Sequence, residues 1–199
     1  MELRTDFIDT KGLEFNDPKW SEAWHHNDKI KRINKGISLR GLGQFLLERG
    51  FTHITVEYEG SGDSGDTYLS EGFMSKEDFD KRGSEGKWGG NGEQCTNYGP
   101  EPQEGTRYQT KLQELYKTYK EYNDKADFGS DGDELHYVLS SMIGYDWYNN
   151  DGGRGELIWD LKKEKVFVDG YQYYQGEVEC QETYFLDGKE PKTKYKDQS

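Results

Sequence analysis

The chain has 199 residues, of which 31% are hydrophobic and 15% aromatic, and its formal net charge is −13 at pH 7. This length suits one hydrophobic core, and the fifteen tyrosines and five tryptophans predict that large amphipathic rings build it. The acidic balance argues against direct binding to nucleic acid or to an anionic membrane, because both require clusters of lysine and arginine. A protein with a basic surface, or a cation, is the partner that this charge favours.

Hydropathy and cysteine content indicate the compartment. The sequence has no run of about 18 apolar residues, and its N-terminus lacks the basic-then-apolar layout of a secretory signal. Cys95 and Cys180 lie far apart, without C-x-x-C spacing or histidines at metal-ligand intervals, which favours two reduced thiols. We therefore expect a cytoplasmic protein, in a bacterial host cell, with no membrane association.

Two helices are expected in the first fifty residues. Asp17 and Pro18 suit the N-cap and first turn of a helix over about residues 18–33. Ser38 can cap a second helix, whose apolar stripe ends at Gly50, a residue that readily adopts the left-handed conformation of a helix stop.

The period then changes from that of a helix to that of a strand. Apolar and polar residues alternate over residues 52–59, which predicts a half-buried strand with Glu57 and Glu59 on one face. Residues 67–74 can return as the second strand of a hairpin. Residues of about 76–106 show no period and predict a glycine-rich loop or insertion.

Two more helices are expected in the middle of the chain. Aromatic and leucine residues recur at three- and four-residue intervals over about residues 108–122, which predicts an amphipathic helix. Asp131 and Glu134 resemble a capping box for the next helix, which Asn149 and Asn150 should end.

The remaining pattern is that of strands. Alternation over residues 155–168 predicts a second hairpin, and residues 177–185 fit a last strand. The polar tail over residues 189–199 is expected to be disordered. Together these elements predict an α+β fold, in which helices pack mainly on one face of an antiparallel sheet built from two hairpins and a last strand. We expect a single domain over residues 1–188, with an N-terminal helical extension.

Two acidic, glycine-dense loops, residues 57–66 and 149–160, are the most informative segments. Gly60, Gly62 and Gly65 match the spacing of a dinucleotide-binding loop. That mechanism requires a helix directly after the loop to hold the phosphates. A strand is expected there instead, so the match does not predict nucleotide binding.

One serine hydrolase arrangement can be drawn from the sequence. Ser64 follows a Gly-Asp pair, as the nucleophile does in one group of serine esterases, and Asp133 with His136 supplies a later Asp-x-x-His pair. Ser64 would attack, His136 would act as the base, and Asp133 would orient it. The simpler interpretation is a helix cap and a partly exposed histidine.

Carboxylates from the two loops could converge if the predicted hairpins are neighbours in the sheet. Such carboxylates repel one another, and a divalent cation, a basic partner or raised pKa values must relieve the repulsion. A solvated sheet face is the plain alternative. The candidate binding residues are Glu57, Glu59, Asp63, Ser64, Asn149, Asn150, Asp151, Arg154, Glu156 and Asp160.

The two loops together resemble an uncharacterised family of small bacterial and phage proteins. Its members pair a strand ending in Gly-x-Gly-Asp-Ser-Gly, here residues 60–65, with a later Asn-Asn-Asp-Gly-x-x-Gly-Glu, here residues 149–156. The resemblance covers about residues 37–75 and 131–185. It implies a compact α+β domain carried on a mobile element, and the family has no activity to transfer.

From charge, tyrosine content and resemblance we expect a phage-encoded, acidic, non-enzymatic binding protein. It would engage and modulate or inhibit a host protein with a basic surface, such as a defence or nucleic-acid-handling protein, because acidic groups steer toward basic patches and tyrosine suits interfaces. Two alternatives stay open. One is a metal-dependent hydrolase that uses the clustered carboxylates, and the other is a protein that binds a small nucleotide-like signalling molecule between the glycine loops.

Overall fold

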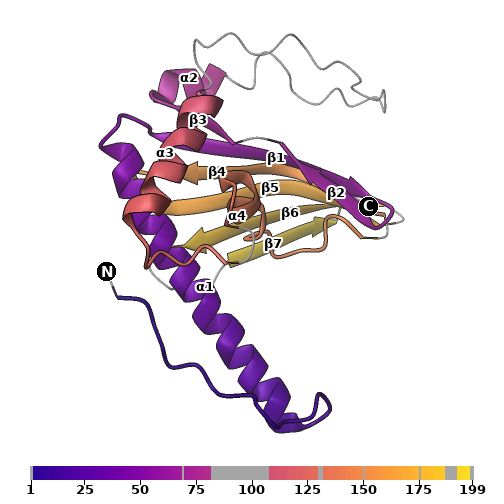
Figure 1. Cartoon of the computed structure of the whole chain (residues 1–199). Helices are drawn as coiled ribbons and strands as arrows, with labels where there is room; N and C mark the ends of the chain where they lie inside the picture. Colours follow the sequence, from indigo (N-terminus) through magenta and orange to yellow (C-terminus); the bar gives the residue numbers. More distant parts are fainter. Residues whose placement is uncertain are drawn as a thin grey trace.

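The computed structural model describes residues 2–68, 70–81, 108–129, 132–149, 151–174, 176–186 and 192–197 (Figure 1). The helices are α1 (Pro18–Leu47), α2 (Lys76–Lys81), α3 (Gln109–Tyr122) and α4 (Leu135–Ser140). The strands are β1 (His53–Ser61), β2 (Ser64–Thr67), β3 (Glu71–Phe73), β4 (Gly153–Asp160), β5 (Lys165–Tyr174), β6 (Gly176–Phe185) and β7 (Lys192–Asp197).

One antiparallel sheet organises the described part of the chain. Its strand order is β2-β1-β4-β5-β6-β7. Strand β3 also pairs with β1, at residues 53–55, whereas β2 pairs with residues 58–61. Helices α1, α3 and α4 lie on one face of this sheet, which we call the inner face (Figure 1). The predicted α+β fold, with helices mainly on one face of an antiparallel sheet, is therefore confirmed.

Helix α1 is continuous where the sequence predicts two helices. Its start is as predicted, because the Asp17 carboxylate accepts a first-turn N–H at 2.8 Å and Pro18 occupies the first turn. Ser38, the predicted second cap, lies inside the helix, where its hydroxyl accepts a hydrogen bond from the Asp127 N–H at 2.8 Å. A tertiary partner thus satisfies the serine side chain, and the helix continues to Leu47. Gly50, whose φ is +90°, gives the predicted stop in the turn that follows.

The strand predictions hold with one change in the first hairpin. Strand β1 confirms the predicted strand, but burial alternates only from Val56 onward, because His53 and Thr55 on the opposite face are buried too. Strands β4, β5 and β6 confirm the second hairpin and the strand that follows it. The predicted return strand over residues 67–74 is instead two short strands, β2 and β3. Both pair with β1, at its end and at its beginning respectively.

The predicted helix after residue 131 is much shorter than expected. Helix α4 ends at Ser140, so Asn149 lies well beyond it, and its N-cap residue Glu134 makes no side-chain capping bond. Asp131 and Asn150 lie outside the described residues. The amphipathic helix predicted over residues 108–122 is confirmed as α3.

The C-terminal tail contains a strand where disorder was expected. Residues 192–197 form β7, which pairs with β6 in register at the edge of the sheet. A strand pairs through its backbone and needs no apolar side chains, and lysine is a common residue on exposed edges. Of the predicted insertion over about residues 76–106, only residues 76–81 are described, as α2.

Helix α1 packs closely on the centre of the inner face. Leu39, Leu42 and Leu46 are completely buried. A Cβ atom added to Gly43 would lie 2.9 Å from the Trp159 ring of β4, so the absence of a side chain sets how near the helix comes.

Glycines are concentrated on the inner face where the end of β1 meets the beginning of β4. Tyr58 of β1 is buried there and shares a hydrogen bond with the hydroxyl of Tyr145. The two hydroxyl groups lie against Gly170 of β5, and the Tyr58 hydroxyl also lies against Gly155 of β4. These glycines leave the space that the two rings occupy.

Replacing Gly170 with alanine should destabilise the fold. Its Cβ would overlap the Tyr58 and Tyr145 hydroxyls, and overpacking of this kind costs about 1–3 kcal/mol. The matched control is Gly36→Ala inside α1, where the nearest atoms would be 3.8 Å away and the change should stabilise the helix by about 0.5–1 kcal/mol. Urea unfolding measures both variants, and equal stabilities would contradict this description of the packing.

Candidate functional site

Three carboxylates share one row on the outer face of the sheet, opposite the inner face. Glu57 of β1 lies opposite Glu156 of β4, which in turn lies opposite Asp169 of β5. The row continues through Gln181 of β6 to Lys194 of β7. Neighbouring strands are about 4.8 Å apart, and like charges directly opposite one another are unfavourable. We call Glu57, Glu156 and Asp169 the acidic row.

A mixed row lies two residues further along the strands. Arg154 of β4 is opposite Glu59 of β1 on one side and Tyr171 of β5 on the other. Its guanidinium carbon is 6.0 Å from the ring centroid of Tyr173, within reach of a cation–π contact. Asp66 of β2 extends the row beyond Glu59. This row therefore combines carboxylates, one guanidinium and aromatic rings.

Toward the beginning of β1 the outer face becomes less polar and is then covered. Thr55 lies opposite Ile158, which lies opposite Phe167. Beyond them the His53 ring stacks on Phe79 of α2, with centroids 4.1 Å apart. Among the described helices, α2 is the one that packs on this face, and it does so at the end remote from the acidic row.

The two glycine-rich loops meet at one end of the sheet, a point that the sequence left open. Gly60 of β1 is opposite Gly153 of β4. Gly152, at a φ of +78°, lies directly against the carbonyl group of Gly60. The turns that carry Asp63 and Asp151 therefore end at the same edge of the molecule.

The first loop is a tight turn, and its candidate residues belong to that turn. Gly62 and Asp63 both have positive φ values, 60° and 67°, which is the backbone of the two-residue turn that hairpins favour. Ser64 begins β2, and its hydroxyl donates to the carbonyl oxygen of Ser61 at 3.2 Å. Both candidate side chains are exposed to solvent.

The second loop is stabilised by a local hydrogen-bond network. The Asn149 side-chain amide donates to both oxygens of Asp146, at 2.9 and 3.0 Å. The Asn149 carbonyl accepts the Gly152 N–H at 2.9 Å, which closes the turn around the exposed Asp151. Asn150 lies outside the described residues. Asn149 thus shapes the loop.

Asp160 does not lie with the other candidate residues. It is four residues from Glu156 along β4, which corresponds to about 13 Å. Its carboxylate accepts the Lys163 backbone N–H at 3.0 Å and pairs with the Lys163 ammonium at 2.7 Å. Burial raises the pKa of Asp160, but the bonds from Lys163 outweigh burial and hold that pKa below its ordinary value. Asp160 therefore stabilises the turn between β4 and β5.

Aromatic groups fill the space that the glycines of the first loop leave on the inner face. A Cβ on Gly60 would lie 2.7 Å from the Trp147 carbonyl oxygen. A Cβ on Gly65 would lie 2.5 Å from the Trp147 ring and 2.7 Å from the Cβ of Tyr148. These glycines admit aromatic residues of the same chain, and a signalling molecule placed above them would compete with those residues.

The suggested serine hydrolase residues do not form a catalytic arrangement. The Asp133 side chain is fully exposed, 3.5 Å from Lys120. His136 is buried within α4, its Nδ1 atom lies 3.3 Å from Glu134, and that atom has no hydrogen-bond partner. The Ser64 hydroxyl donates to its own turn. The aspartate therefore does not orient the histidine as the hypothesis requires.

No group of three or more histidine, cysteine, aspartate or glutamate side chains that could hold a metal ion occurs within the described ranges. No helix among the described residues is long and apolar enough to cross a membrane. Comparisons with protein-family models, with curated proteins and with solved structures find no match for this chain.

Sequence reasoning missed two members of the outer face, Asp169 and Tyr171. The alternation in this strand could have identified them. Val166 and Val168 face the core, so Asp169 and Tyr171, at odd positions of the same strand, must point outward. The register with β4 could not be read from the sequence, and only that register places Asp169 beside Glu156.

His136 should make the fold sensitive to acid. Burial lowers the pKa of this imidazole, and the Glu134 carboxylate only partly offsets the effect. Below an ordinary histidine pKa of 6.5 the unfolded chain therefore binds a proton that the folded chain resists. The free energy of unfolding should fall as the pH drops below this value.

Urea unfolding at several pH values between 7 and 5 measures this sensitivity. His136→Leu should reduce the loss of stability at low pH, whereas His25→Gln, at an exposed position, should leave it unchanged. An acid response that is identical in both variants would assign the sensitivity to other groups.

Proposed function

We propose that this chain is an acidic, non-enzymatic binding protein whose outer sheet face engages a basic surface on a host protein. The observation that carries the proposal is the acidic row, in which Glu57, Glu156 and Asp169 occupy three successive strands in register. Glu57 and Asp169 are exposed, and Glu156 is partly exposed. Carboxylates held in register on a sheet face steer a surface rich in lysine or arginine toward that face.

The residues beside the acidic row suit a protein interface. Tyr171, Tyr173 and Arg154 lie next to it, and tyrosine and arginine are enriched where proteins bind each other. A β-sheet also holds these side chains on a rigid backbone, so little conformational freedom is lost on binding. The acidic row would steer a basic partner to the face, and the rings would supply the buried contact area.

The alternatives have less support among the described residues. A metal-dependent hydrolase needs a ligand set, and no suitable group occurs in the described ranges. Binding of a signalling molecule between the glycine loops requires space that Trp147 and Tyr148 occupy on the inner face. Origin on a phage, and a defence or nucleic-acid-handling protein as the target, stay predictions from the resemblance and the charge.

Removing the charge of the acidic row should abolish partner binding without unfolding the protein. The variant Glu57→Gln, Glu156→Gln and Asp169→Asn preserves side-chain shape and removes three negative charges. Capture of a host protein from bacterial lysate should fall by about tenfold or more, since several charge contacts are lost together. Wild-type capture should also weaken as salt is added.

The matched control removes the same three charges from α3 and its C-terminal end, with Glu114→Gln, Glu121→Gln and Asp124→Asn, all at exposed positions. This control should retain the partner in near-equal amount. A partner that the acidic-row variant retains as well as the control does would place the interface elsewhere. Recovery of a bound metabolite or ion, with no protein, would favour the sequestration or enzyme hypotheses.

A further inference from the structure

The first half of α1 projects beyond the sheet as an arm (Figure 1). The N-terminal residues run alongside this half of the helix in the opposite direction. The chain then reverses near Gly12, where φ is +86°, before α1 begins. We call residues 2–33 the arm and the rest of the protein the body. The projecting helical part, residues 18–33, is about 24 Å long at 1.5 Å per residue.

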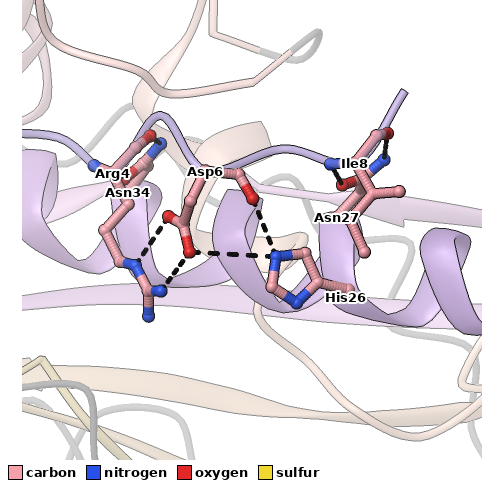
Figure 2. A network of polar contacts seen from close by, with 6 residues as sticks. All are labelled: Arg4, Asp6, Ile8, His26, Asn27 and Asn34. Atoms are coloured by element: carbon pink, nitrogen blue, oxygen red, sulfur yellow. Dashed lines mark hydrogen bonds and ion pairs between the residues drawn. The ribbon is translucent and has the colours of Figure 1, made fainter.

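Two asparagines bind the N-terminal segment through its backbone. Asn34 accepts the Arg4 N–H at 2.8 Å and donates to the Arg4 carbonyl at 2.9 Å. Asn27, two helical turns earlier, binds the N–H and carbonyl of Ile8 in the same way, at 2.8 Å each. Figure 2 shows both pairs on one side of the helix. The arm is therefore a two-layer unit.

An ionic contact between these pairs adds to the attachment of the segment. His26 Nε2 is 2.8 Å from the Asp6 carbonyl oxygen, and the Asp6 carboxylate pairs with the Arg4 guanidinium (Figure 2). The pKa of Asp6 is held below its ordinary value, chiefly by the Arg4 hydrogen bond. The segment is thus ordered along the helix, and its apolar side chains Phe7 and Ile8 are each 45% exposed.

Large rings gather at the free end of the arm. The centroids of Phe15 and Trp20 are 4.6 Å apart, and those of Trp20 and Trp24 are 6.5 Å apart. Phe15 is 80% exposed and Trp24 is 49% exposed. We call these three rings the tip patch. Phe15 and Trp24 thus expose ring surface on either side of the partly buried Trp20, and large exposed apolar patches mark interaction surfaces.

The distribution of charge favours a second copy of this chain as the partner of the tip patch. The first 33 residues contain seven acidic and six basic residues, so almost all of the net charge of −13 resides in the body. Residues 9–22 include four acidic and two basic residues. The base of the arm carries the exposed basic residues Lys29, Lys31 and Arg32, of which Arg32 pairs with Asp28 at 2.8 Å. Two arms side by side in antiparallel orientation place the acidic tip of each beside the basic base of the other.

The geometry also limits repulsion between two acidic bodies. In an antiparallel pair the bodies lie at opposite ends of the paired arms, separated by roughly 24 Å of helix. Screening in physiological salt acts over about 8 Å, so the bodies would repel one another weakly. A twofold axis between the arms gives both copies the same interface, the commonest arrangement in soluble dimers.

We propose that two copies of this chain associate through their arms, antiparallel, and bury the tip patch of each against the arm of the other. This interface is separate from the acidic row, so a dimer presents two outer faces. The self-complementary charge pattern along the arm favours a second copy over another partner.

Sedimentation velocity on the full chain, from about 1 to about 100 μM, tests the association. The wild type should pass from monomer to dimer as its concentration rises. Phe15→Ser with Trp24→Ser should remain monomeric, because both rings are exposed and their loss removes the interface without opening the core. The control, Tyr122→Ser with Tyr137→Ser, removes rings that are 82% and 51% exposed on other helices and should dimerise normally.

A charge exchange tests the orientation of the arms. One copy carries Glu14→Lys and Glu22→Lys at the tip, and the other carries Lys31→Glu and Arg32→Glu at the base, all at exposed positions. Each copy alone should dimerise more weakly than the wild type, and a mixture should form mixed dimers. A wild type that stays monomeric, a dimer that survives loss of the tip patch, or a mixture that gains nothing would each overturn the proposal.

Discussion

The packing of aromatic rings onto glycines determines how the sheet of this protein is built. Tyr58 and Tyr145 meet above Gly155 and Gly170, and Trp147 lies across the end of the first hairpin. A side chain at any of these glycines would separate the strands from the segment that covers them. The glycines are therefore needed for core packing, although in the sequence they resemble a loop that binds phosphate.

This packing explains why the two faces of the sheet differ. The inner face takes up the helices and the aromatic rings, so residues of opposite alternation must point outward. In β1 and β4 those residues include Glu57 and Glu156, which the strand register places opposite each other. The burial of Tyr58 and Leu157 on the inner face stabilises the two strands in this register.

Features with a local physical cause were predictable from the sequence. The alternation in the second half of β1, the stop at Gly50 and the period of α3 each depend on neighbouring residues, and all three are confirmed. Features that depend on distant partners were not. Ser38 stays helical because Asp127 binds it, and Asp169 joins the acidic row only through the register of two strands. The loops were correctly identified as neighbours of strands, but the sequence could not show that they meet.

Carboxyl labelling read by mass spectrometry tests the central claim most directly, because it measures the exposure of each acidic side chain in the free protein and in its partner complex. We expect Glu57, Glu156 and Asp169 to be modified in the free protein and protected in the complex. Glu114 and Glu121 on α3 should be modified equally in both. Unchanged labelling of the acidic row, together with protection of α3, would contradict binding through the outer face of the sheet.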